Sequence, residues 1–449
     1  MILVAAFFAF DRLSYPDIRT WDEGTNAGVV AASLDAGSWP ALAGPGGPFF
    51  EKPPLWYYAA SAMVALRGFD AIALRLPAAM AGFVLILLVG FAARRFGSPA
   101  AAAVAVLFLL SCGHLFFFKP DGWFSTHHMR SADSDVVQIA LMFGAFLAFS
   151  RCGEGRMRGL YLGAVLCGLA VMAKGPLGLL PAIVLVAFQI VSPKRFPIGA
   201  KHAAIAVLLL VATAGPWHLY MLAAYGRPFF DAYVLHHLVQ RATGVIEEHS
   251  GPWWLYFMLL TVRRICGSVE VLAIAVAAAL VDRRRLAEYR VAAPLLSITL
   301  LMLIISSIGT KLAWYMLPLY PYGALLVGDL VDRCRRFGSG GLIAVLAVAA
   351  VLGYPAARNA RDIARLRPGW METFIGRSRA RCGDEITYDD PRLPGDIAYL
   401  LRHERIERAP RGTSRCSIGW RDTEGSPSPG DACRVVDAQG HLALWECRP

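Results

Sequence analysis

Long apolar runs constrain the fold of this 449-residue chain more than any other feature of its sequence. A helix of about 20 apolar residues spans the hydrocarbon core of a bilayer. Read with a window of about 20 residues, such runs fall at about 1–13, 74–93, 99–118, 135–150, 159–173, 176–192, 202–221, 264–281, 291–309, 312–330 and 340–355. Only 17% of the residues are charged, against about 25% in a soluble domain. We therefore predict a polytopic α-helical membrane protein with about 11 transmembrane helices.

The charges of the connecting loops predict which side of the membrane each loop faces. Lys and Arg accumulate in cytoplasmic loops, and one set of loops is rich in them: 94–95, 151–158, 194–201, 283–290 and 333–336. The alternating set is then extracytoplasmic: 14–73, 119–134, 222–263 and the turn near Lys311. These basic loops also explain the net charge of +11, so we predict no nucleic-acid partner. We expect a multi-pass protein of a bacterial-type inner (plasma) membrane.

The polar tail, residues 356–449, differs in composition from the rest of the chain and contains four cysteines: Cys382, Cys416, Cys433 and Cys447. An even number in a small polar segment predicts two disulfides and an oxidising compartment, and leaves the connectivity open. Eleven spans also place the tail outside. We predict a transmembrane domain over 1–355 and a small extracytoplasmic α/β or β cap over 356–449. Four free thiols in a cytosolic tail are the alternative.

The first outer loop contains two charged segments. Asp22-Glu23 precede a helical pattern, and Glu51-Lys52-Pro53-Pro54 stand before an aromatic, apolar run. A connector of about 60 residues is usually functional or disordered, and its aromatics and spaced alanines favour interfacial helices lying on the membrane. Asp22 and Glu23 also suit a solvated helix N-terminus without any further role.

Further charged residues stand in the later outer loops. Asp135 ends the segment Arg130-Ser131-Ala132-Asp133-Ser134-Asp135, and Lys174 and Lys311 interrupt apolar runs. Each has a structural alternative, since Asp135 suits a helix cap and a lysine at a helix end can snorkel. The third loop contains His236-His237 and Arg241. Histidine with an acid can bind zinc or manganese, although an interfacial role without a ligand also fits this spacing.

Acids, bases and histidines thus gather on one predicted face of the membrane. Cations suit an anionic lipid phosphate, and carboxylates suit a general base or metal ligands. The third loop also contains Trp253, Trp254 and Tyr256, an aromatic pattern typical of the membrane interface.

These motifs, in this order, make the chain resemble the GT-C glycosyltransferases of the aminoarabinose (lipid A) transferase and protein mannosyltransferase superfamily. The resemblance covers about 21–328. Its motifs are Asp22-Glu23, Gly37-Ser38-Trp39, Glu51-Lys52-Pro53-Pro54, Arg75-Leu76-Pro77, Arg130-x-Ala132-x-x-Asp135, Lys174-Gly175-Pro176, His236 with Arg241, Pro252-Trp253-Trp254, Lys311-Leu312 and Pro318-Leu319-Tyr320-Pro321. The tail resembles no family.

The resemblance implies roles for nine residues. Asp22, Asp135 and Glu23 are the implied catalytic carboxylates, with Asp22 activating or positioning the acceptor. Lys52, Arg241, Lys174 and Lys311 are implied to bind the lipid phosphate. Glu51 and His236 are implied ligands of a divalent metal such as zinc, manganese or magnesium, and whether His236 or His237 binds it stays open.

The function implied is transfer of a sugar from a polyprenyl-phosphate donor to an acceptor on the extracytoplasmic face. Lipid A or its core, another envelope glycan and a protein hydroxyl are the alternative acceptors. A transporter or flippase of polyprenyl-linked sugars is the competing class, but it would show broken helices and charges near the membrane midplane, often in repeated halves. The charges here lie in outer loops and the sequence contains no internal repeat, which favours the enzyme.

Overall fold

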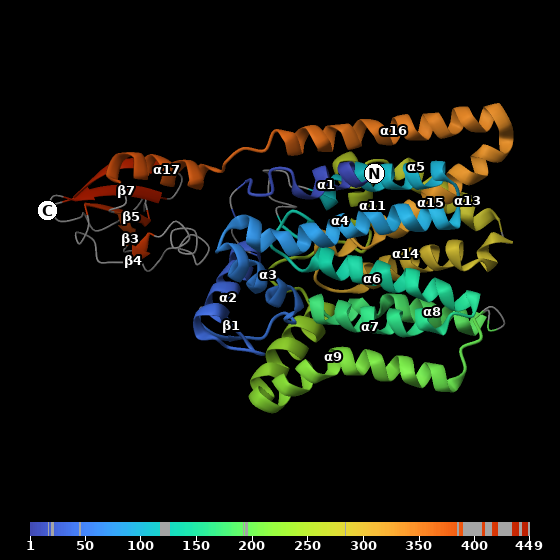
Figure 1. Cartoon of the computed structure of the whole chain (residues 1–449), viewed down its shortest axis with the longest axis horizontal. Helices are drawn as coiled ribbons and strands as arrows, with labels where there is room; N and C mark the ends of the chain where they lie inside the picture. Colours follow the sequence, from blue (N-terminus) through green and yellow to red (C-terminus); the bar gives the residue numbers. More distant parts are fainter. Residues whose placement is uncertain are drawn as a thin grey trace.

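The chain folds into a bundle of long helices that lie side by side, with a smaller helix and sheet unit beyond one end (Figure 1). The computed structural model describes residues 1–16, 18, 22–44, 46–116, 126–191, 193, 196–282, 284–383, 386–388, 406–408, 415–420, 433–439 and 442–447. Its α-helices are α1 (Ile2–Phe10), α2 (Asp22–Ala36), α3 (Leu55–Arg67), α4 (Ala71–Phe96), α5 (Pro99–Ser111), α6 (Asp135–Ser150), α7 (Met157–Lys174), α8 (Leu180–Val191), α9 (Ala200–Phe229), α10 (Arg241–Thr243), α11 (Leu255–Thr261), α12 (Arg263–Cys266), α13 (Val269–Val281), α14 (Tyr289–Ser307), α15 (Leu319–Cys334), α16 (Gly338–Ala364) and α17 (Trp370–Cys382).

Five helical segments of the described chain are long and apolar enough to cross a membrane: Ala71–Phe96, Asp135–Glu154, Ala200–Thr243, Tyr289–Ser307 and Ala313–Ala364. Shorter apolar helices run over Pro99–Ser111, Pro176–Val191 and Val269–Val281. The prediction of a multi-pass helical membrane protein is thereby confirmed. The number of 11 spans stays a prediction.

Local sequence explains where several of these helices begin. The side chains of Asp70 and Ser98 accept hydrogen bonds from the backbone N–H groups of Ala73 (2.6 Å) and Ala101 (3.1 Å), at the starts of α4 and α5. Ser268 caps α13 in the same way. Such caps satisfy N–H groups that have no partner within the helix. They therefore fix the ends of adjacent helices and the short turns between them.

Small residues and aromatic rings set the packing of the bundle. A Cβ atom at Gly163 of α7 would lie 2.2 Å from the ring of Phe149 of α6, so the two helices approach closely because this residue has no side chain. Near the same end, Phe146 stacks on Tyr289 of α14 at 5.5 Å between ring centroids. These contacts hold α6, α7 and α14 together without polar groups.

The arginine-rich loops come together at one end of the bundle. Arg333 at the end of α15 donates to Asp329 at 2.7 Å and to the carbonyl oxygen of Ala278 in α13 at 2.8 Å. Arg285, before α14, also pairs with Asp329. Because α4 is 26 residues long, these loops lie at the opposite end from the first outer loop. The loops grouped by charge in the sequence therefore share one end of the bundle.

The first outer loop contains α2, a short antiparallel hairpin of β1 (Leu42–Gly44) and β2 (Gly47–Phe49), and α3. These elements share an apolar core that includes Val30, Trp56 and Tyr57. Figure 1 shows them gathered at one end of the bundle. The loop is thus a folded cover over that end, and its position on a membrane surface stays a prediction.

Beyond α16 the chain forms α17 and a five-stranded sheet in the order β4-β3-β5-β7-β6. The strands are β3 (Ile386–Tyr388), β4 (Glu407–Arg408), β5 (Cys416–Trp420), β6 (Cys433–Gln439) and β7 (Leu442–Cys447). A disulfide joins Cys382 of α17 to Cys416 of β5. The boundary predicted between residues 355 and 356 falls inside α16, and much of the tail between 384 and 432 lies outside the described residues. The domain division and the capping role stay predictions.

Candidate functional site

A cavity of about 510 Å³ opens at the end of the bundle that carries the first outer loop. Its wall comes from α2, the segments before α3 and α6, the end of α7, the π-helix η4 (Phe230–Gln240) and the turn after Lys311. Among the predicted site residues, those that line it are Asp22, Glu51, Lys52, Asp135, Lys174 and Arg241. Glu23, His236 and Lys311 are absent from that lining. Residues up to about 220 positions apart in the chain therefore meet in one place.

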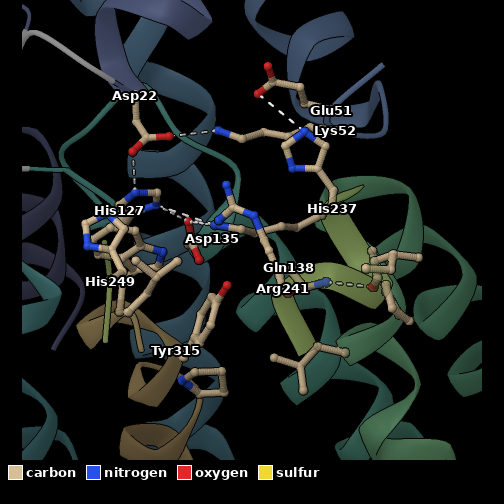
Figure 2. Close-up of a pocket in the computed structure, with 18 of the residues that line it drawn as sticks. Asp22, Glu51, Lys52, His127, Asp135, Gln138, His237, Arg241, His249 and Tyr315 are labelled. Carbon is tan, nitrogen blue, oxygen red and sulfur yellow. Dashed lines mark hydrogen bonds and ion pairs between the residues drawn. The ribbon is translucent and has the colours of Figure 1, made fainter. Parts of the chain in front are cut away.

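His127 lies at the centre of the charged groups (Figure 2). Its Nε2 is 2.9 Å from Asp22 Oδ2, and its Nδ1 is 2.6 Å from Asp135 Oδ2. Its ring is only 2% exposed and stacks on Trp314 at 3.9 Å, with 12° between the planes. A single imidazole therefore connects Asp22 and Asp135, two of the three carboxylates that the resemblance implied to be catalytic.

Two lysines approach the same carboxylates from other sides. Lys52 Nζ is 3.2 Å from Asp22 Oδ1 and 3.7 Å from Asp133 Oδ2. Lys174 Nζ pairs closely with Asp135 and is 3.8 Å from Asp133 Oδ1. With a protonated imidazole, the three carboxylates face three cations. Such mutual compensation is the condition under which buried charges persist.

The electrostatics outside the membrane-spanning segments agree with that charge state. Burial opposes the charge on His127, yet Asp133, Asp22 and Asp135 raise its pKa well above the ordinary value. Burial also opposes the charge on Asp22, but His127 and Lys52 lower the pKa of this carboxyl far below its ordinary value. The pKa of Lys52 is raised in spite of its burial, mainly by Asp133 and Asp22. At neutral pH all three groups are therefore charged.

Sequence reasoning missed His127 and passed over Asp133. His127 belongs to no motif, and its backbone has a φ of 67°, which is uncommon for a residue other than glycine. The loop is fixed from both sides, because Asp133 Oδ2 accepts from Asn26 Nδ2 at 3.1 Å and the backbone N–H of Ala132 donates to Glu23. The Asp-x-Asp pattern of Asp133 and Asp135 was the one available signal.

Glu23 lies in the protein interior, behind the cavity wall. It is 1% exposed and pairs with Arg75 of α4, at 2.7 Å and 3.0 Å from the two carboxylate oxygens. Arg75 also donates to the carbonyl oxygens of Leu13 and Pro16. This bidentate pair ties α2 to α4 and to the chain before α2. Its contacts are those of a structural ion pair, which differs from the catalytic role that the resemblance implied.

Lys311 also differs from its implied role. Its Nζ donates to the carbonyl oxygens of Ile305, Ser306 and Ile308, at distances of 2.6 Å to 3.1 Å. These are carbonyl groups at the end of α14, which have no partner within the helix. Lys311 therefore caps α14 and directs its charge away from the cavity lining. Arg241, by contrast, lines the cavity and pairs with Glu247 at 3.4 Å.

The structure also distinguishes the two histidines of the third loop. His237 Nε2 lies 4.0 Å from Glu51 Oε2, and both residues line the cavity (Figure 2). His236 instead contacts Gln240 on its own helix, with 2.8 Å between Nδ1 and Oε1. In this geometry His237 faces Glu51 and His236 does not, so which histidine binds a metal stays a prediction.

A second group of metal-ligand types lies at the cavity wall and in the interior behind it. Asp22, His127 and Asp133 offer ligand atoms within 4.8 Å of one another. Both nitrogens of this imidazole already face carboxylates, however, and Lys52 occupies the space beside them. A cation at this position would have to displace Lys52 and the imidazole proton, so these residues fit a metal ion less well than Glu51 and His237 do.

The chain is similar in sequence to known membrane transferases. A family model described as dolichyl-phosphate-mannose-protein mannosyltransferase matches residues 51–220. An undecaprenyl phosphate-alpha-4-amino-4-deoxy-L-arabinose arabinosyl transferase of Pseudomonas aeruginosa (strain UCBPP-PA14) is 28% identical over 371 residues, covering 78% of this chain and 64% of the relative. A transferase of the same description from Pseudomonas fluorescens (strain Pf0-1) is 26% identical over 263 residues, covering 58% and 45%. The chain thus spans about half to two thirds of these relatives.

Solved structures share the fold. ArnT from Cupriavidus metallidurans bound to undecaprenyl phosphate superposes with a TM-score of 0.73 at 19% identity, covering 99% of this chain and 96% of that one. An Archaeoglobus fulgidus oligosaccharyltransferase in complex with Zn and sulfate gives a TM-score of 0.54 at 13% identity, covering 91% and 62%. The fold that the resemblance implied is thereby confirmed.

Proposed function

We propose that this chain, a GT-C glycosyltransferase by its resemblance to the aminoarabinose transferase and protein mannosyltransferase superfamily, transfers a sugar from a polyprenyl-phosphate donor to an envelope acceptor. The observation that carries the proposal is the cavity in which Lys52, Lys174 and Arg241 meet Asp22 and Asp135. The two Pseudomonas relatives are described as transferases of undecaprenyl phosphate-linked aminoarabinose. A pentose of that kind is therefore the donor sugar to test first.

The cations would bind the lipid phosphate as it leaves. Negative charge on the phosphate grows in the transition state, so positive groups already held in place stabilise it more than the ground state. Lys52 and Lys174 are held by carboxylates, with side chains 16% and 19% exposed. Arg241 lies on the wall formed by the third loop. A phosphate entering from the open side would meet these three groups without their having to reorganise.

The two carboxylates would position the acceptor. A general base works best when its pKa lies near the working pH, whereas His127 and Lys52 lower the pKa of Asp22 far below its ordinary value in spite of burial. Asp22 is thus a weak base in this arrangement. That suits an acceptor that needs orientation rather than deprotonation, such as a phosphate group of lipid A, better than a sugar or protein hydroxyl.

A divalent ion would be held by Glu51 and His237. Their ligand atoms are 4.0 Å apart, which one ion bound about 2 Å from each can bridge. Zinc and manganese suit this mixed oxygen and nitrogen pair better than magnesium does. Such an ion would supply a further positive charge beside the phosphate. Asp22, Lys52 and His127 would carry out the same positioning with or without it.

The proposed function also implies an orientation in the membrane and a division of the chain into two domains. We place the cavity and residues 356–449 on the extracytoplasmic face of an inner membrane, with 1–355 as the transferase domain. The arginine network of the opposite end supports this orientation, because Lys and Arg favour the cytoplasmic side. The charges at the outer end, far from the midplane, favour an enzyme over a flippase.

Reconstituted transfer tests the proposal. The purified chain in vesicles, given undecaprenyl phosphate-linked aminoarabinose and lipid A, should produce lipid A that carries the added sugar mass. Asp22→Asn and Lys52→Ala should abolish the product, while Asp35→Asn, on the exposed end of the same helix, should leave it unchanged. Full transfer by both site variants would exclude this active site.

A further inference from the structure

Five arginines form a patch at the end of the bundle that carries the cavity. Arg358 and Arg361 come from the last turns of α16, Arg365 directly follows that helix, and Arg263 and Arg264 come from α12. We call this set the arginine patch. Its two groups are in contact, because Arg358 donates to the carbonyl oxygen of Arg263 at 3.2 Å. The catalytic proposal uses none of these residues.

The three arginines at the end of α16 lie on one face of the helix and its C-cap. Residues three and seven positions apart point in nearly the same direction on an α-helix, and Arg358, Arg361 and Arg365 have this spacing. The opposite face is buried, with Asn359 donating to the carbonyl oxygens of Leu110 and Ser111. The arginine stripe therefore faces outward from the bundle.

The length of α16 places this stripe at the level of lipid headgroups. The helix begins at Gly338, and about 20 residues suffice to cross the hydrocarbon core. Exposed apolar side chains run along it from Leu342 to Val351, followed by Tyr354, which is 73% exposed. An aromatic ring of this kind is typical of the membrane interface. Arg358 and the residues after it then lie beyond the hydrocarbon.

The neighbouring element repeats this order. Exposed Trp253, Trp254 and Phe257 precede Arg263 and Arg264. In both segments that form the patch, exposed aromatic side chains are thus followed along the chain by arginines. From both segments of the chain, the patch is thus expected at the depth of the lipid headgroups.

The patch has more positive charge than its surroundings neutralise. Glu270 lies 3.7 Å from Arg263, and Asp362 lies 3.6 Å from Arg264, both beyond hydrogen-bond distance. Within the part of the chain that the structure describes, no carboxylate pairs with Arg361 or Arg365, and both of these side chains are exposed. Guanidinium groups with free donors fit phosphate oxygens, which they can bind through two hydrogen bonds at once.

We propose that the arginine patch binds the phosphate-bearing headgroup of an anionic lipid in the leaflet at the cavity end of the bundle. The membrane positions such a headgroup, and the arginines supply its counter-charge. This inference does not depend on the transfer reaction. It gives the protein a lipid site outside the cavity.

Lipid binding to the purified full-length chain tests the proposal. Native mass spectrometry in detergent would compare phosphatidic acid with phosphatidylcholine of the same acyl chains. We expect preferential binding of phosphatidic acid, and Arg361→Gln/Arg365→Gln should weaken it roughly 30-fold, from about 1 kcal/mol for each arginine near an anionic surface. Arg67→Gln/Arg227→Gln is the matched control, because those arginines are at the same end and are already paired with Asp70 and Asp231.

Three outcomes would overturn the proposal. They are equal binding of both lipids, equal loss in the patch variant and the control, and displacement of phosphatidic acid by inorganic phosphate at millimolar concentration, which would indicate a site for free anions. Both variants change exposed side chains, so we expect both to fold. Size-exclusion profiles that match the unmodified protein will show that a difference in lipid binding does not come from misfolding. Transfer activity of the patch variant is a separate measurement, and its loss or retention leaves the binding result intact.

Discussion

His127 is the residue on which the arrangement of the charged groups depends most. It separates Asp22 from Asp135 and supplies one of three cations to three carboxylates. We predict that His127→Gln lowers transfer about 100-fold, the effect of removing one fixed group that stabilises charge in an active site. Three carboxylates would then share two lysines, so one of them would hold a proton at neutral pH.

The pH profile distinguishes this role from a loss of folding. In the unmodified protein burial opposes the charge of His127, but the three aspartates raise its pKa well above the ordinary value, so it stays protonated and the rate should be flat around neutral pH. In His127→Gln a carboxyl pKa rises, and the rate should increase with pH as that group loses its proton. A flat profile in the variant, at any rate level, would contradict the charge-balance role.

The pair Glu51 and His237 gives a second prediction about single residues. His237→Ala should abolish zinc or manganese binding measured by titration of the purified protein, because one of the two facing ligands is lost. His236→Ala is the natural control, since this neighbour contacts Gln240 and lies off the cavity lining. Equal metal binding by both variants would show that the ion binds at another site. The carboxylates around His127 would then be the next candidate ligands.

The buried ion pair of Glu23 and Arg75 stabilises the packing of two helices, because it joins α2 to α4. Removing one partner of a buried ion pair typically costs roughly 3–5 kcal/mol, so Glu23→Gln should lower the thermal unfolding temperature strongly. Glu23→Gln/Arg75→Gln should be less harmful, since no unpaired charge remains. Arg67→Gln breaks an exposed pair with Asp70 and should cost less than about 1 kcal/mol. Unchanged stability with lost transfer in Glu23→Gln would support the catalytic role that the resemblance implied for this residue.

The elements of the bundle were more predictable than the contacts between them. Long apolar runs and capping residues act within one segment, so the sequence indicated α4, α6 and α14, and loop charge indicated which loops share one end of the bundle. The partners of Glu23, His127 and Lys311 depend on chain segments up to 109 residues away or on the exact end of a helix. A motif supplies the residue types of such a site, but only the folded loop decides which of His236 and His237 turns inward.

Two cysteines in the last two strands, β6 and β7, test whether the tail lies in an oxidising compartment outside the membrane. Cys382 and Cys416 form a disulfide, and the backbone register pairs Cys433 of β6 with Cys447 of β7. Adjacent positions on paired strands suit a cross-link, so we predict a second disulfide between them. Peptide mapping after alkylation without reduction should find a linked peptide containing both residues. Alkylated Cys433 and Cys447 would contradict it.

The orientation of the whole molecule connects the proposed site, the disulfides and the arginine patch. If the cavity faces outward, single cysteines introduced at Ser250 in the third loop and at Arg156 in the loop before α7 should report opposite sides, since both positions are exposed. We predict that a membrane-impermeant maleimide labels Ser250→Cys in intact cells, and Arg156→Cys only after permeabilisation. The native cysteines at 112, 152, 167 and 266 are buried, so their background is low. The reverse pattern would place the arginine network outside, against the preference of Lys and Arg for the cytoplasm, and would remove the donor phosphate from reach of Lys52.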